Sequence, residues 1–162
     1  MILKVREWPD PILLVPCADW QFASELQPAA LYDNLIDTIK AEDALGLAAN
    51  QIGVPFRVMA MHVQQTGDYV VLFNPCLLEV DDQHDSGPEM CLSFPGVKLQ
   101  VARPRAVLVE YQDRFAVQQR SRFEGIDARC FLHELDHLNG ITFNSHVSGL
   151  KFRTALQRAR KK

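Results

Sequence analysis

The residues best suited to chemistry stand together in one HExxH sequence, His133-Glu134-Leu135-Asp136-His137. Residues four apart on a helix share one face, so both imidazoles can reach a single metal ion. Glu134 follows the first histidine and can take a proton from water at that ion. The alternative is two partly buried histidines beside an ordinary surface glutamate. It is the weaker interpretation because this motif rarely arises by chance.

A catalytic metal site of this type normally has three protein ligands, so one ligand lies outside the motif. In one protease class a third histidine follows in the pattern HExxHxxGxxH, but here that position is Phe143. Another class uses a downstream glutamate, and no acidic residue follows Asp136. The remaining candidates are His146, which would make an endopeptidase, and Cys91 upstream. A thiolate with two imidazoles is a known catalytic set for zinc and also suits ferrous iron, which favours Cys91.

A further segment, 44–53, is rich in small residues, which permit close approach of a ligand or of the HExxH helix. Within it, Gln51 is either a turn amide or a hydrogen-bond donor for a developing oxyanion. Cys130 lies one turn before the HExxH motif and is predicted to line the pocket. Cys17 and Cys76 are predicted to be core residues.

Together these segments resemble the three motifs of the peptide deformylase family, GxGxAAxQ, EGCLS and HExDH. In this chain they read ALGLAANQ (44–51), EMCLS (89–93) and HELDH (133–137), in the order and at the spacing of the family. The sequence WPDPIL (8–13) is also similar to the family's N-terminal segment, so the resemblance covers about residues 1–150. It implies an α+β fold in which a central HExxH helix packs among mostly antiparallel strands. It also implies a hydrolase that removes the N-formyl group from formyl-methionine of nascent polypeptides and releases formate.

The resemblance assigns a role to each motif residue. It implies that Cys91, His133 and His137 hold one divalent metal ion, natively Fe²⁺, which Zn²⁺ or Ni²⁺ can replace. It implies that Glu134 takes the proton of the attacking water and later gives it to the departing amine.

The resemblance also implies how the substrate is bound. The Gln51 side chain and the Leu92 backbone N–H would hold the oxyanion. The positions that match peptide-pairing backbone are Leu45, Gly46 and Met90, and those that match the wall of the methionine pocket are Ile126 and Cys130.

The chain departs from the family pattern at three positions. Ala44 replaces the first glycine of the first motif, so a backbone angle that favours glycine is in question. Met90 replaces the glycine beside Cys91, and Leu132 stands where glutamine commonly precedes HExDH. None of the three is a ligand or the base, so we expect the activity to be retained and the substrate range to be affected.

Length and composition predict one catalytic domain over residues 1–162, with 48% hydrophobic and 23% charged residues. The predicted helices are 24–42, capped by Ser24, 125–139 and 148–160, and the predicted strands are 57–63, 69–73, 77–80, 106–111 and 115–118. Segments 85–88 and 103–104 contain Gly-Pro and Arg-Pro and are predicted to be loops. This order of elements predicts an α+β fold with an antiparallel sheet.

Charge is unevenly distributed, although the formal net charge is only −3. Before residue 147 there are 11 basic and 20 acidic side chains, a net charge of −9, and the remainder has six basic and no acidic ones. The basic tail consists of Lys151, Arg153, Arg158, Arg160, Lys161 and Lys162. This tail suggests phosphate contacts with the ribosome or RNA. A second hypothesis for the whole chain is a deformylase-like binding module with reduced catalysis that docks there through the tail. The alternative is a solvated helix whose Phe152–Leu156 stripe packs on the body.

No apolar run reaches the roughly 18–20 residues that span a bilayer. Glu7 and Asp10 stand where a signal peptide would be apolar. We therefore expect a monomeric cytoplasmic protein without a membrane segment, whose four cysteines are free thiols or ligands.

Overall fold

The computed structural model describes residues 1–23 and 26–161. The α-helices are α1 (Pro28–Ala41), α2 (Gly125–Leu138) and α3 (Gly149–Ala159), and the 3-10 helices are η1 (Pro11–Leu14), η2 (Ala49–Ile52) and η3 (Phe143–His146). The strands are β1 (Gly46–Ala48), β2 (Val58–His62), β3 (Tyr69–Val80), β4 (His84–Met90), β5 (Lys98–Pro104), β6 (Ala106–Gln112) and β7 (Gln118–Glu124). Within this described chain, no helix has the length and apolar character that crossing a membrane requires.

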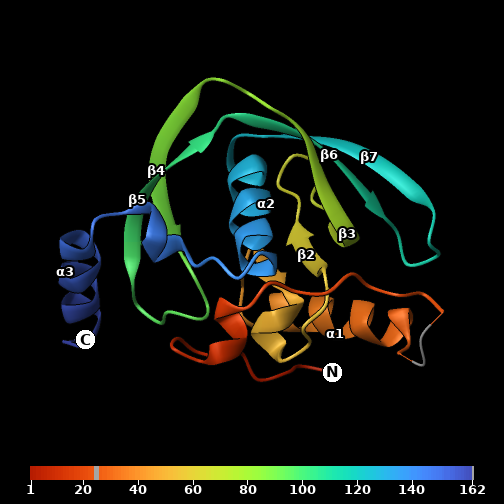
Figure 1. Ribbon diagram of the computed structural model, residues 1–162, viewed down its shortest axis with the longest axis horizontal. Coiled ribbons are helices and arrows are strands. Elements are labelled where there is room, and N and C mark those ends of the chain that lie inside the picture. Colours follow the sequence, from red (N-terminus) through yellow and green to blue (C-terminus); the bar gives the residue numbers. More distant parts are fainter. Residues whose placement is uncertain (24–25, 162) are drawn as a thin grey trace.

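The strands form two antiparallel sheets. Five strands pair in the order β1-β2-β3-β6-β7, and β4 and β5 form a separate two-stranded sheet. Helix α2 stands in the middle of the molecule, with β4 and β5 on one side and the larger sheet on the other (Figure 1). The predicted α+β fold, with the HExxH helix among antiparallel strands, is confirmed.

Helix α2 forms where predicted because apolar residues recur at helical spacing and bury one face in the core. Phe131 is fully buried in a cluster that also contains Met59 and Val109 of the larger sheet. Gly140 ends the helix with a φ of 72°. A Cβ there would lie 2.8 Å from the carbonyl carbon of Val15, so only glycine lets the N-terminal segment pass this close.

The first predicted helix is also present, and it begins at Pro28. The expected cap, Ser24, lies outside the described residues, and Gln27 occupies the N-cap position. Proline suits the first turn of a helix because its missing N–H would have no helical partner there. Leu35 and Ile39 are fully buried in a second cluster, which joins α1 to β1, β2 and β3.

The two segments predicted to be loops, 85–88 and 103–104, lie instead in β4 and β5. Pro88 faces Gln100 and Pro104 faces His84 in this ladder. The prediction is wrong because proline is tolerated where a strand has a free edge, and in the described part of the chain β4 and β5 pair only with each other.

The predicted strand 115–118 is wrong as well, because a turn occupies most of it. The Asp113 carboxylate accepts hydrogen bonds from the backbone N–H groups of Phe115 and Val117. Strand β7 therefore begins only at Gln118.

The predicted strands 69–73 and 77–80 are one strand, β3, with an irregular register between them. Asn74 has a φ of 49° at this point, which lets the strand bend and continue. The bend leaves Cys76 exposed, so its assignment to the core is wrong, whereas Cys17 is buried as predicted.

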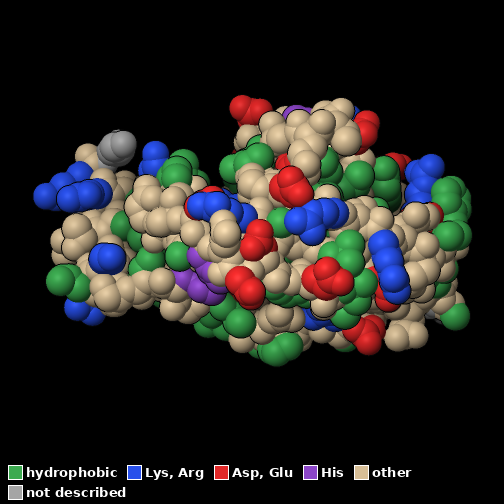
Figure 2. Space-filling model, turned by 90° about the horizontal axis from the view of Figure 1, so that it is seen from above, with side chains coloured by type: hydrophobic (Ala, Val, Ile, Leu, Met, Phe, Trp, Pro, Cys, Tyr) green, Lys and Arg blue, Asp and Glu red, His purple; other side chains and the backbone are tan. Residues whose placement is uncertain are grey.

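Helix α3 packs on β5 through the predicted apolar stripe, at one end of the molecule (Figure 1). The Phe152 ring lies 5.6 Å from Trp8 and 6.1 Å from Phe94, measured between centroids. The opposite face is basic, and Figure 2 shows blue side chains gathered at this end. The exposed ones among the described residues are Lys151, Arg153, Arg158, Arg160 and Lys161. Lys162 lies outside the described residues.

Replacing Phe131 with alanine is expected to destabilise the protein by about 3–5 kcal/mol, because it empties a fully buried volume between α2 and the sheet. Denaturant unfolding of the variant measures the change in free energy. Phe115→Ala is the matched control, since that ring is 73% exposed. Equal stability of the two variants would contradict the placement of Phe131.

Candidate active site

Three potential metal ligands meet between β4 and α2. Cys91 directly follows β4, and His133 and His137 lie one turn apart on α2. One ligand atom from each lies within 4.8 Å of the other two, and all three residues are buried. The Sγ of Cys91 is 3.2 Å from Nε2 of His137. The donors fit a divalent metal ion, since a thiolate and two imidazoles leave room for a further ligand.

The two histidines of the motif differ in protonation. Burial lowers the pKa of His137 well below its usual value, so the imidazole is neutral, the form that binds a metal. The Nδ1 of His133 lies 2.8 Å from Oε1 of Glu89, which leaves its Nε2 for the metal. Burial lowers the pKa of His133, but hydrogen bonds to Cys91 and Glu89 outweigh it and raise that pKa well above its usual value, so His133 releases a proton when a metal binds.

Glu89 is held by more than His133. Arg103 donates from Nε to Oε2 of Glu89 at 2.9 Å and from Nη2 to Oε1 at 3.0 Å. Burial alone would raise the pKa of Glu89, but hydrogen bonds from His133 and Arg103 lower it to about 2. The carboxylate is therefore ionised and orients the first histidine of the motif.

His146 belongs to a different cluster. Its Nε2 lies 2.7 Å from Oδ2 of Asp136, and Arg103 donates to the same oxygen at 2.7 Å. Among the described residues, the group that could hold a metal contains Cys91 and not His146. The endopeptidase arrangement with His146 as third ligand is therefore wrong.

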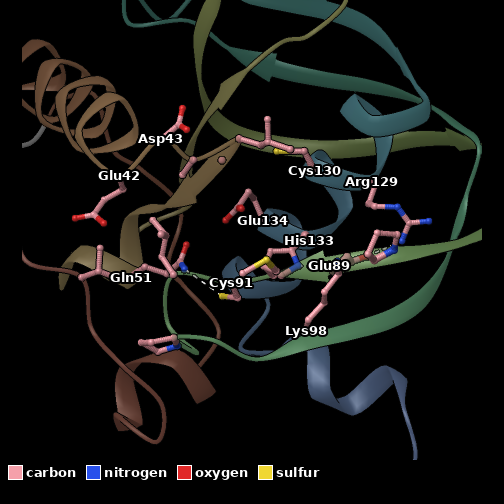
Figure 3. A pocket seen from close by; sticks show the side chains of 18 of the residues that line it. Glu42, Asp43, Gln51, Glu89, Cys91, Lys98, Arg129, Cys130, His133 and Glu134 are labelled. Carbon is pink, nitrogen blue, oxygen red and sulfur yellow. Dashed lines mark hydrogen bonds and ion pairs between the residues drawn. The ribbon is translucent and has the colours of Figure 1, made fainter. Parts of the chain in front are cut away.

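Glu134 faces the cavity from α2 (Figure 3). It is buried, and its Oε2 has no hydrogen-bond partner among the described residues. Burial raises its pKa to about 7. A Cβ at Gly46 would lie 2.8 Å from Oε1 of Glu134 and 2.6 Å from Sγ of Cys130, so β1 can approach α2 only because residue 46 is glycine.

Gln51 is oriented by its own segment. Its Oε1 accepts a hydrogen bond from the Ala48 N–H at 2.8 Å, which turns the amide nitrogen toward the ligand cluster. That nitrogen donates to Oγ of Ser93 at 3.0 Å and lies 3.6 Å from Sγ of Cys91. The structure thus brings this predicted donor to the cluster.

The cavity in front of these groups has a volume of about 780 Å³ and lies between β1 and β4. Figure 3 shows Gln51, Cys91 and Glu134 around its centre. Every position predicted from the sequence to bind substrate lines it, namely Leu45, Gly46, Met90, Leu92, Ile126 and Cys130.

Sequence reasoning missed the supporting network of Glu89, Arg103 and Asp136. Glu89 was noted only as part of a motif, and Arg103 stood in a segment predicted to be a loop. The available signal was the alternation of buried residues around Arg103, since Leu99 and Val101 also point inward from β5.

A family model supplies the decisive comparison. The model for polypeptide deformylases matches residues 2–153. This chain belongs to the polypeptide deformylase family.

Individual deformylases resemble the chain over most of its length. The peptide deformylase of Agrobacterium fabrum is 40% identical over 124 residues, which are 75% of this chain and 73% of that protein. The structure of the Ehrlichia chaffeensis peptide deformylase in complex with actinonin has a TM-score of 0.91 and 29% identity, and covers 99% of this chain and 96% of its own. A Met-Ala-Ser-bound class I type b peptide deformylase from Acinetobacter baumannii has a TM-score of 0.84 and 30% identity. The match covers 91% of this chain and 99% of that one.

The three departures from the deformylase motifs have different consequences. Ala44 is not among the described residues with positive φ, whereas Asp43 has a φ of 49°, so alanine fits without backbone strain. Met90 is 63% exposed at the cavity rim, where it can contact a bound peptide. Leu132 is buried in the core and fills space there.

Replacing Cys91 with alanine is expected to abolish tight binding of a divalent metal, because two imidazoles alone make an incomplete site. His146→Ala is expected to retain the metal, since His146 bonds Asp136 outside the cluster. Metal analysis of dialysed protein measures both, with the exposed Cys76→Ala as control. Metal retained in Cys91→Ala and lost in His146→Ala would contradict this ligand assignment.

Proposed function

We propose that this chain is a metal-dependent hydrolase that removes the N-formyl group from the formyl-methionine of nascent polypeptides and releases formate. The observation that carries the proposal is the convergence of Cys91, His133 and His137 within 4.8 Å, with the carboxyl group of Glu134 facing the same cavity. Membership of the polypeptide deformylase family supports the reaction.

The metal ion is assigned to Cys91, His133 and His137, and we take Fe²⁺ as the native ion, which Zn²⁺ or Ni²⁺ can replace. The mixed sulfur and nitrogen donors suit all three ions. When bound, a divalent ion supplies Lewis acidity toward water and toward the formyl carbonyl.

Glu134 acts as the proton carrier. Its Oε2, which has no hydrogen-bond partner among the described residues, takes a proton from the attacking water and then delivers it to the amine that leaves. A buried carboxyl group with a pKa of about 7 suits both steps, because it can accept and release a proton near neutral pH.

The side-chain nitrogen of Gln51 and the backbone N–H of Leu92 stabilise the oxyanion that forms at the formyl carbon. The hydrogen bond that the Ala48 N–H donates to Oε1 of Gln51 supports this role, since it fixes the direction of the amide before substrate arrives. Leu92 directly follows Cys91 and lines the same cavity.

The peptide binds as an added strand between the two sheets. Strand β1 ends the order of the larger sheet, β4 pairs with β5 on one side, and both line the cavity. Backbone at Leu45, Gly46 and Met90 then pairs with the substrate. Ile126 and Cys130 contact the methionine side chain.

Glu134→Ala is expected to lower kcat for formyl-Met peptides by about 10²–10⁴-fold, because the proton carrier is removed. Its metal content should equal that of the unaltered chain. Formate release and metal content are measured together without oxygen, which protects Fe²⁺ and the Cys91 thiolate. Glu79→Ala, an exposed glutamate, is the control. Full activity in Glu134→Ala would contradict the mechanism, and no formate from the unaltered metal-loaded chain would contradict the function.

The basic face of α3 contacts the ribosome, where formylated chains emerge. Its exposed charges face away from the packed stripe, which supports a phosphate-binding role. Substrates made on ribosomes support a cytoplasmic location. The proposal takes the protein to act as a monomer, since Cys91, His133, His137 and Glu134 together complete the site within one chain.

Neutralising Lys151, Arg153 and Arg158 together with glutamine is expected to weaken ribosome binding about tenfold or more and to reduce its salt dependence, because phosphate contacts are lost. Deformylation of a free tripeptide should be unchanged, since α3 lies outside the cavity. Neutralising Arg114, Arg120 and Arg122 on the β6–β7 hairpin is the charge-matched control. Equal loss of ribosome affinity in both triple variants would contradict a specific role for α3.

A further inference from the structure

Arg129 ties helix α2 to both strands of the small sheet. It lies one turn before His133, and its side chain is only 12% exposed. From α2 its Nη1 donates to the Val101 carbonyl of β5 at 2.7 Å, and its Nη2 donates to the Asp85 carbonyl of β4 at 2.7 Å. Figure 3 shows its guanidinium pointing away from the centre of the cavity. Arg129 belongs to the wall of the cavity, but the hydrogen bonds of its guanidinium run to the protein.

The same guanidinium completes the hydrogen bonding of Glu89. Its Nη1 donates to Oε2 of Glu89 at 2.9 Å, beside the bond from Nε of Arg103 to that oxygen. The other oxygen of Glu89 lies 2.8 Å from Nδ1 of His133. Arg129 therefore contacts both the backbone of β4 and the carboxylate that orients a metal ligand.

Gly87 in β4 makes this contact possible. A Cβ at Gly87 would lie 3.0 Å from Nη2 of Arg129 and 3.1 Å from its Cζ. Glycine weakens a strand interior and is found there when another group must approach closely. Gly87 and Arg129 form an interlock, in which the strand lacks a side chain where the guanidinium lies.

The small sheet needs such an anchor. A two-stranded sheet is marginally stable by itself. Strand β4 forms one side of the cavity, and Met90 at its end lies on the rim. The distance between β4 and β1 therefore depends on contacts that hold β4 against α2.

We propose that Arg129 is a positioning residue that sets the place of β4 relative to α2, and so the width of the cavity that receives the peptide. The proposal rests on the function proposed above, since it assumes a peptide bound between β1 and β4. Gln51 lies on η2 and Glu134 on α2 itself, so neither moves with β4, and Arg103 still holds Glu89 when Arg129 is removed. Loss of Arg129 is thus expected to weaken peptide binding more than the chemical step.

Arg129→Ala is expected to raise KM for formyl-Met-Ala-Ser about tenfold or more, while kcat stays within about threefold. The Kd of the tripeptide Met-Ala-Ser, measured without turnover, should rise by the same factor, and metal content should not change. A merely structural defect would lower the folded, active fraction and hence kcat, and would leave KM of the remainder unchanged. Arg105→Ala is the matched control, because this exposed arginine bonds the Asp85 side chain.

Gly87→Ala tests the interlock from the other side. The added methyl group displaces the guanidinium, so KM should rise as in Arg129→Ala. In the double variant Gly87→Ala/Arg129→Ala, KM should match that of Arg129→Ala within about twofold, because the obstructed group is already gone. If Arg129→Ala does not fold, Arg129→Lys replaces it in these comparisons, since lysine keeps the charge but loses the forked donors.

Three results would overturn the proposal. The first is an active Arg129→Ala enzyme with unchanged KM and Kd, and the second is a fall in its kcat alone. The third is a double variant in which the effects of Gly87→Ala and Arg129→Ala on KM multiply. If the unaltered chain releases no formate, the proposed function fails, and the Kd for Met-Ala-Ser still reports whether Arg129 positions β4.

Discussion

The burial of one carboxylate, that of Glu89, constrains the rest of the structure. A carboxylate removed from water is stable only when hydrogen bonds and opposite charge replace its hydration. Glu89 is bonded by Arg103 of β5 and by Arg129 and His133 of α2. Leaving such a charge unpaired costs about 3–5 kcal/mol, a large share of a domain's stability. The small sheet and the central helix therefore fold into one arrangement relative to each other.

This arrangement also places the metal ligands. Glu89 and Cys91 are two residues apart, so fixing the carboxylate against α2 brings the thiol to the helix as well. His133 is turned by the same carboxylate, and the thiol lies 3.2 Å from His137. One buried network therefore both joins the small sheet to the central helix and places the proposed metal ligands.

Local patterns could be predicted from the sequence, and contacts between distant segments could not. The spacing of His133 and His137 defines one helix face, so this part of the site follows from periodicity alone. The third ligand, Cys91, was favoured over His146 by its donor chemistry, and the family resemblance then assigned it, because nothing local shows which segment reaches the helix. Strands β4 and β5 were missed because their prolines are typical of loops, while their pairing depends on residues far apart. Arg129 gave no signal, since its partners are backbone carbonyls of that unpredicted sheet.

Because residue 46 is glycine, β1 can lie close to α2 while Glu134 stays buried. Strand β1 must lie near α2 for its backbone to reach a peptide in the cavity, and Glu134 must be buried for its pKa to rise to about 7. A Cβ on residue 46 would meet both Glu134 and Cys130, so a larger residue would displace these side chains or β1. With glycine, the strand that we propose pairs with the peptide also shields Glu134 from water. In the proposed complex, the reacting end of the peptide lies beside a proton acceptor that is already shielded from water.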